Sequence, residues 1–157
     1  MSNRQPGINN KNNNRSRCLS SGPFERNQNM KWYEINPLRL ELERRLLGQY
    51  HPGCKLIKYN GKFTVQLQIR TRKRSYQLSG IFPDRFPNDP MRVRIERPKI
   101  TDGPPHYFSY DGGLCIYGSG NYGPETTAKV YLDWAKQWIK SYEHWQDMRI
   151  WPKTNGR

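Results

Sequence analysis

The chain has few cysteines and no long apolar run, and each shortage excludes a class of protein. Three cysteines among 157 residues, with no signal-peptide pattern, argue against a secreted disulfide scaffold and for a reducing cytoplasm. No apolar run approaches the roughly 20 residues that a membrane-spanning helix requires. We therefore expect a soluble cytoplasmic protein without a membrane span, with one domain large enough to bury a core.

Motifs for metals and nucleotides are also missing. The histidines, His51, His106 and His144, and the three cysteines do not fall at ligand spacing such as Cys-x-x-Cys. The chain has no Gly-x-x-x-x-Gly-Lys-Ser/Thr phosphate loop. We expect no metal and no cofactor.

Acidic residues are scarce relative to basic ones. The chain has 27 Lys and Arg against 13 Asp and Glu, a formal net charge of +14. Such a charge favours anionic partners, with nucleic acid as the first candidate and an acidic protein as the second. Charge alone does not choose between them.

Residues 1–30 differ in composition from the rest. This segment is rich in Asn, Arg, Ser and Gly and has almost no apolar residues, so we expect a disordered basic tail. Cys18 lies in this tail, and we assign it no role. The tail is a possible nucleic-acid contact. Residues 31–157 are then the single folded domain.

A helix is predicted to begin at Asn36, a capping residue, and Pro37, and to end between Gly48 and Pro52. Its expected buried stripe contains Leu38, Leu42, Leu46, Leu47 and Tyr50, and its expected water-facing residues are Arg39, Glu43 and Arg44.

Four strands are predicted after this helix. An Asn-Gly turn at residues 59–62 joins the first two, and alternating apolar residues mark segments 63–69, 76–78 and 91–95. The short connections predict an antiparallel meander with one apolar face. The other face is polar and basic, and its residues are Gln66, Gln68, Arg70, Arg92 and Arg94.

A long helix is predicted near the C-terminus from aromatic residues at spacings of three and four, namely Tyr131, Trp134, Trp138, Tyr142 and Trp145. Such a stripe is typical of a core rather than of a cofactor site. The fold class is therefore α+β.

Cys115 is the candidate nucleophile. It follows the glycine pair Gly112-Gly113, whose conformational freedom allows a side chain just beyond it to be presented at a surface. A thiolate is a strong nucleophile, and nearby positive charge favours it. By its local sequence alone, Cys115 is either a catalytic residue or an ordinary half-buried cysteine.

The segment 81–90, with prolines at 83, 87 and 90, resembles the ubiquitin-conjugating enzyme family. The helix and strand order before it, and a His-led loop at His106 with Cys115 beyond it, resemble that family too. The likeness covers roughly residues 37–150. The Asp-Gly-Gly-Leu-Cys motif at 111–115 and the aromatic helix look closer to bacterial members, encoded beside cGAS-like nucleotidyltransferases in anti-phage CBASS systems or in ubiquitin-like modifier operons.

The resemblance implies that Cys115 accepts a protein C-terminus as a thioester and transfers it to a lysine amine of a target protein. The donor would be the cGAS-like nucleotidyltransferase or a ubiquitin-like modifier, activated elsewhere. This fits a chain that lacks a phosphate loop. His106 would either assist ionisation of the thiol or brace the loop.

The sequence departs from the family in the oxyanion donor. The family has His-Pro-Asn where this chain has residues 106–108, His-Tyr-Phe. Backbone N–H groups near Cys115 are the candidate donors, and Asn121 is a weaker one. Asp111 and Glu125 are the nearest acids that could orient an amine, and Tyr117 is a further supporting candidate.

Two other readings stay open. A non-catalytic binding module of the same fold would grip an acidic partner or nucleic acid with the polar sheet face. A Cys-His hydrolase is compatible with the chemistry, although the order of strand, prolines and loop does not favour it.

Overall fold

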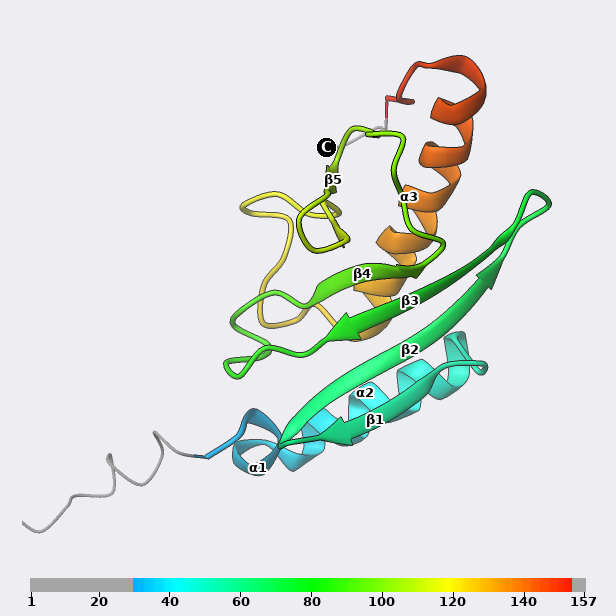
Figure 1. The fold of residues 1–157 in the computed structure, drawn as a ribbon. Coiled ribbons are helices and arrows are strands. Elements are labelled where there is room, and N and C mark those ends of the chain that lie inside the picture. The colour runs from blue at the N-terminus through cyan, green and yellow to red at the C-terminus, as the bar shows by residue number, and fades with distance from the viewer. Residues whose placement is uncertain (1–29, 154–157) are drawn as a thin grey trace, which may run out of the picture.

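The computed structural model describes residues 30–153, so the expected basic tail, with Cys18, lies almost wholly outside the described residues. Within this range the chain has the expected mixed α+β class, with an antiparallel sheet and a long C-terminal helix (Figure 1). None of the helices between residues 30 and 153 is long and apolar enough to cross a membrane.

In the described residues the sheet has six strands in the order β1-β2-β3-β4-β6-β5, and every neighbouring pair is antiparallel. Their bounds are β1 Lys55–Tyr59, β2 Lys62–Arg70, β3 Ser75–Ile81, β4 Arg92–Arg97, β5 Tyr107–Phe108 and β6 Gly113–Leu114. The first four strands lie where the sequence pattern places them. The last two, which extend the sheet beyond β4, are not predicted by that pattern.

The first hairpin turns at Asn60 and Gly61, both with positive φ (49° and 71°), as an Asn-Gly turn requires. In β2 the side chains then alternate, with Phe63, Val65 and Leu67 buried and their neighbours facing outward. The period-two pattern therefore fixes which face of the sheet meets the core.

Two helices precede the sheet, α1 (Trp32–Ile35) and α2 (Pro37–Tyr50). The Asn36 side chain accepts the N–H of Arg39 at 3.0 Å, which makes it the cap of α2. The prediction of the buried face of α2 is wrong in part. Leu47 is buried, but Leu38 is 81% exposed and Glu43 is fully buried.

Glu43 is buried because α2 meets the N-terminus of α3 (Ala128–Met148) rather than only apolar side chains. One carboxylate oxygen of Glu43 accepts the N–H of Ala128 at 2.8 Å, and the other accepts Nε–H of Arg39 at 2.7 Å. A free N–H at a helix start needs an acceptor, and a negative charge is favourable there. Hydrophobic periodicity carries no information about such a contact.

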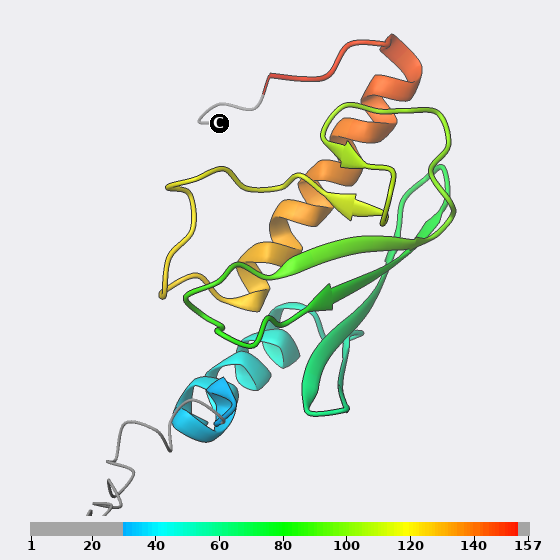
Figure 2. The same cartoon turned by 60° about the vertical axis from the view of Figure 1, so that its left-hand side comes forward.

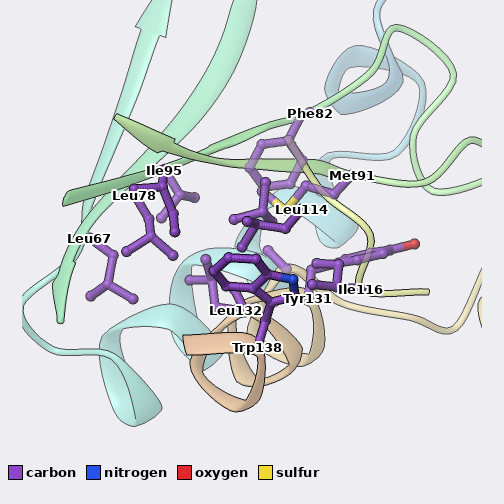
Figure 3. Close-up of a cluster of buried hydrophobic side chains, with 14 of the residues drawn as sticks. Leu67, Leu78, Phe82, Met91, Ile95, Leu114, Ile116, Tyr131, Leu132 and Trp138 are labelled. Carbon is purple, nitrogen blue, oxygen red and sulfur yellow. The ribbon is translucent and has the colours of Figure 1, made fainter. Parts of the chain in front are cut away.

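The core lies between the sheet and α3 (Figure 3). Leu78 and Ile95 reach it from β3 and β4, and Leu132 and Trp138 reach it from α3. Tyr131, Trp138 and Tyr142 are buried, and Trp134 and Trp145 are half-buried. The prediction that the aromatic stripe forms core is confirmed.

The proline-rich segment 81–90 is anchored by aromatic rings. Phe82 stacks on Trp32 with ring centroids 5.2 Å apart, and Phe86 contacts the same indole edge-on at 4.9 Å. All three side chains are buried. The segment is thereby tied to α1.

Candidate active site

Cys115 lies directly after β6, half-buried and with a free thiol. Its N–H donates to the carbonyl oxygen of His106 at 3.0 Å, which continues the pairing of Tyr107 with Leu114 by one step. The β5–β6 turn therefore brings residues nine positions apart directly opposite each other. It lies beside β4 at one edge of the sheet (Figure 2).

His106 acts on this arrangement through its backbone. It has a positive φ of 58°, and its carbonyl oxygen accepts a second hydrogen bond, from the indole N–H of Trp138, at 2.8 Å. Its ring lies against Trp151, with centroids 5.3 Å apart, where the chain after α3 turns back toward the loop. Among residues 30–153 no hydrogen bond joins the imidazole to the Cys115 thiol.

The two glycines before the cysteine differ in their conformation and surroundings. Gly112 has φ +74°, and a Cβ there would lie 3.2 Å from the carbonyl oxygen of Ile95. Gly113 has an ordinary φ, but a Cβ there would lie 2.9 Å from both Nη2 of Arg92 and Oδ1 of Asp111. The first glycine allows the turn, and the second allows two charged side chains to close over the backbone.

The carboxylate of Asp111 already has partners in the structure. Its Oδ2 lies 2.5 Å from Nη2 of Arg92 and 3.9 Å from Nη2 of Arg94, and its Oδ1 accepts the N–H of Gly113 at 2.9 Å. Arg92 also donates to the Tyr110 hydroxyl at 2.9 Å, and this bond raises the pKa of the guanidinium. Asp111, the sequence-based candidate for orienting an amine, is thus bound to β4 and to the loop backbone.

Tyr117 is the other supporting candidate near the thiol. It is half-buried, with its ring 5.1 Å from that of Tyr122 and 5.7 Å from that of Tyr131. Burial raises the pKa of Tyr117; the charge of Arg92 opposes this, and the nearby Tyr122 and Cys115 add to it. The hydroxyl therefore stays protonated at neutral pH and can donate a hydrogen bond.

The remaining loop candidates are exposed. Asn121 lies in a turn in which its N–H donates to the carbonyl oxygen of Gly118 at 3.1 Å, and Glu125 lies just before α3. One backbone candidate for the oxyanion donor is occupied, because the N–H of Cys115 is bound to His106.

The outer face of the sheet is the face for which the sequence predicts polar and basic residues. Gln66 pairs with Ser79 across β2–β3, and Ser79 pairs with Arg94 across β3–β4. Gln66 and Gln68 line a shallow hollow of about 560 Å³, whereas Arg70 lies outside it. Of the two β4 arginines of this face, Arg92 forms a close ion pair with the carboxylate of Asp111, and Arg94 lies 3.9 Å from it.

Sequence reasoning missed the connection between α2 and the loop that follows the cysteine. Arg39, bound to Glu43, donates to the carbonyl oxygens of Pro124 at 2.5 Å and Thr126 at 2.7 Å. The spacing of Arg39 and Glu43, four residues apart on a helix, was the available signal. It indicates an ion pair but not its burial or its further partners.

No group of three or more His, Cys, Asp or Glu side chains that could hold a metal ion occurs between residues 30 and 153. Cys54, the other free cysteine in this range, is half-buried away from the loop, and burial raises the pKa of its thiol.

Comparison with known protein families places most of this chain within one family model. The family model described as Type II CBASS E2 protein matches residues 43–156, more than half of the chain, and this range contains β1–β6, α3 and Cys115. No curated protein and no solved structure matches. With more than half of its length, including the cysteine loop, inside that match, the chain belongs to the Type II CBASS E2 family.

Proposed function

We propose that this protein is a conjugating enzyme of a bacterial anti-phage CBASS system, with Cys115 as its nucleophile. The observation that carries the proposal is the placement of Cys115. It is a half-buried free thiol at the end of a hairpin whose backbone is fixed on both sides, in a chain of the E2 family.

The chemistry consists of two acyl transfers. In the first, the Cys115 thiol loses its proton and its sulfur attacks the activated C-terminal carbonyl of a donor protein. A C–S bond forms, the bond from the carbonyl to the activating group breaks, and AMP or another thiol leaves. In the second, a lysine amine attacks the thioester carbonyl. A C–N bond forms, the C–S bond breaks, the thiol of Cys115 is regenerated, and the amine loses a proton.

The family membership supports a donor from the same system, the cGAS-like nucleotidyltransferase, whose C-terminus would be attached to a lysine of a target protein. A ubiquitin-like modifier is the alternative donor. The excess of basic residues favours an acidic patch on whichever partner docks.

His106 supports the reaction by bracing the loop. Its carbonyl oxygen holds both the Cys115 backbone and the Trp138 indole, and these bonds do not depend on the charge of the ring. Substitution of the His106 side chain is therefore expected to slow adduct formation far less than loss of Cys115.

The test is an adduct in cells. When the protein is expressed with the products of its neighbouring genes, it should carry a protein adduct that reducing agent removes. Cys115→Ala should abolish the adduct, and Cys115→Ser should trap it as an ester that reducing agent leaves intact. Cys54→Ser is the matched control and should behave as wild type. A wild-type protein that never carries an adduct would overturn the proposal.

The rival function, a non-catalytic module that grips an anionic partner with the outer sheet face, is less well supported. Arg92, one of its three arginines, is already in a close ion pair with Asp111, and a second, Arg94, lies 3.9 Å from the same carboxylate. Electrostatic binding to nucleic acid should weaken steeply between low and physiological salt, and an Arg70→Gln variant should weaken it further.

A further inference from the structure

We propose that Asp111 is a positioning residue for Cys115 and that Arg92 is the group that holds Asp111 in place. The inference rests on the function proposed above, because the position of Cys115 matters most if its sulfur is the reacting atom. It assigns Asp111 to the loop backbone rather than to the incoming amine.

The first support is that the Asp111 carboxylate bridges two parts of the fold. Oδ2 lies 2.5 Å from Nη2 of Arg92 in β4, and Oδ1 accepts the N–H of Gly113 at 2.9 Å. Gly113 is two residues before Cys115 in the chain, and β6 pairs with β4 at Gly113 and Arg94. The carboxylate therefore links a central strand to the backbone that leads directly into the cysteine.

The second support is that the Arg92 guanidinium is held on several sides. It donates to the hydroxyl of Tyr110 at 2.9 Å, and its central carbon lies 5.5 Å from the ring centre of Phe108 and 5.7 Å from that of Tyr110. Contact of one planar cation with a carboxylate, a hydroxyl and aromatic rings suits arginine better than lysine. The aromatic residues on one arm of the turn thus bind the same side chain that binds Asp111.

The third support is the space that Gly113 leaves open. A Cβ at this position would lie 2.9 Å from Nη2 and 3.2 Å from Nε of Arg92. Both atoms therefore close over the glycine backbone. Gly113, the aspartate two residues before it and the arginine on β4 are therefore in mutual contact, and we call these three residues the loop clamp (Arg92, Asp111, Gly113).

The loop clamp is expected to order the loop more than to stabilise the whole fold. The side chains of Arg92 and Asp111 are 39% and 19% exposed, and partly exposed ion pairs contribute little to global stability. Small displacements of a nucleophile, however, reduce reaction rates strongly. Its loss should thus appear in the rate of Cys115 chemistry before it appears in unfolding.

A surface ion pair in the same protein provides the control. Arg85 and Asp89 are 3.7 Å apart, and their side chains are 76% and 42% exposed. Asp89→Asn removes a carboxylate of similar kind with no link to the cysteine loop.

The experiment compares wild type, Asp111→Ala, Arg92→Ala, the double variant and Asp89→Asn at a temperature well below unfolding. The rate of formation of the reducing-agent-sensitive adduct should fall about tenfold in each clamp variant. The double variant should be no slower than either single one, because the two residues act as one unit. Asp89→Asn should match wild type. An Asp111→Ala variant with the wild-type rate, or additive losses in the double variant, would overturn the inference.

A second readout separates this inference from the proposed function. Hydrogen exchange of segment 106–116 should accelerate in Asp111→Ala and not in Asp89→Asn, with the melting temperature nearly unchanged. Iodoacetamide labelling of Cys115, followed on the tryptic peptide Ile100–Lys129, should change in rate in the same variant. If wild type forms no adduct but these changes occur, the proposed function fails and the clamp stands. If neither exchange nor labelling changes, the clamp fails.

Discussion

The indole N–H of Trp138 donates to the same carbonyl oxygen of His106 that accepts the backbone N–H of Cys115, at 2.8 and 3.0 Å. Trp138 is buried in the middle of α3, whereas Cys115 is half-buried at the edge of the sheet. One oxygen thus joins the helical core to the backbone of the candidate nucleophile. Trp138, which belongs to the aromatic stripe that the sequence assigns to the core, therefore also donates a hydrogen bond to the cysteine loop.

Trp138→Phe should keep most of the ring packing and remove the donor. We expect the free energy of unfolding to fall by about 1–2 kcal/mol, as for loss of one partner of a buried hydrogen bond. Adduct formation at Cys115 should slow as well, because the His106 carbonyl loses one of its two anchors. Urea unfolding and the adduct rate measure the two effects. Trp145→Phe, on the same helix, changes a ring that stacks on Tyr142 instead and should show a clearly smaller loss of rate. Equal losses would contradict the role of the indole donor.

Glu43→Gln should destabilise the fold by about 3 kcal/mol, the lower end of the range for breaking a buried ion pair from one side. Arg39 would lose the carboxylate that balances its charge, and the Glu43 side chain has no exposed surface. Denaturant unfolding measures the loss. Glu41→Gln, an exposed substitution on the same helix, should change stability by less than about 0.5 kcal/mol. A Glu43→Gln variant as stable as the Glu41 variant would refute the role of the pair.

The electrostatics of His51 can be tested with neighbouring residues. Burial lowers the pKa of His51, the charge of Lys136 lowers it further, and the charge of Asp133, whose carboxylate is 3.2 Å from Nε2, raises it. Lys136→Met should therefore raise the pKa of His51, and Asp133→Asn should lower it. An NMR titration of the imidazole Cε1 proton measures both, and shifts in the same direction would contradict the assignment.

The lowered pKa of His51 also predicts a pH dependence of stability. Below about pH 6.5 the unfolded chain binds a proton at this histidine that the folded chain does not, so the free energy of unfolding should fall as the pH falls through that range. Above it His51 contributes no slope. Urea unfolding between pH 5 and 8 should show a shallower acid-side loss in His51→Gln than in wild type. Identical slopes would mean that His51 is not the group responsible.

The sequence predicts the parts of the fold that depend on local repetition. Strand alternation in residues 63–69 and aromatic spacing in α3 reflect which face is buried, and the Asn36 cap depends on neighbours three residues away. Each of these signals is contained in a short window. These elements can therefore be predicted without information about tertiary contacts.

The parts that the sequence does not predict depend on partners far apart in the chain. Glu43 is buried because of Ala128, which is 85 residues away, and Asp111 is held by Arg92 across the sheet. The same holds for the candidate site. The resemblance to the conjugating-enzyme family nominates Cys115 and His106 as candidates. It does not predict that the contact between them uses the carbonyl oxygen of His106 rather than its ring.

The most direct test of the central claim is to locate the acyl bond. Adduct-bearing protein purified without reducing agent should give the tryptic peptide Ile100–Lys129 with the C-terminal remnant of the donor attached, because Cys115 is the only cysteine in that peptide. Hydroxylamine should release the remnant, as it does from a thioester, and Cys115→Ala should lack it. A remnant attached to a lysine, or to Cys54 or Cys18 with Cys115 unmodified, would contradict it.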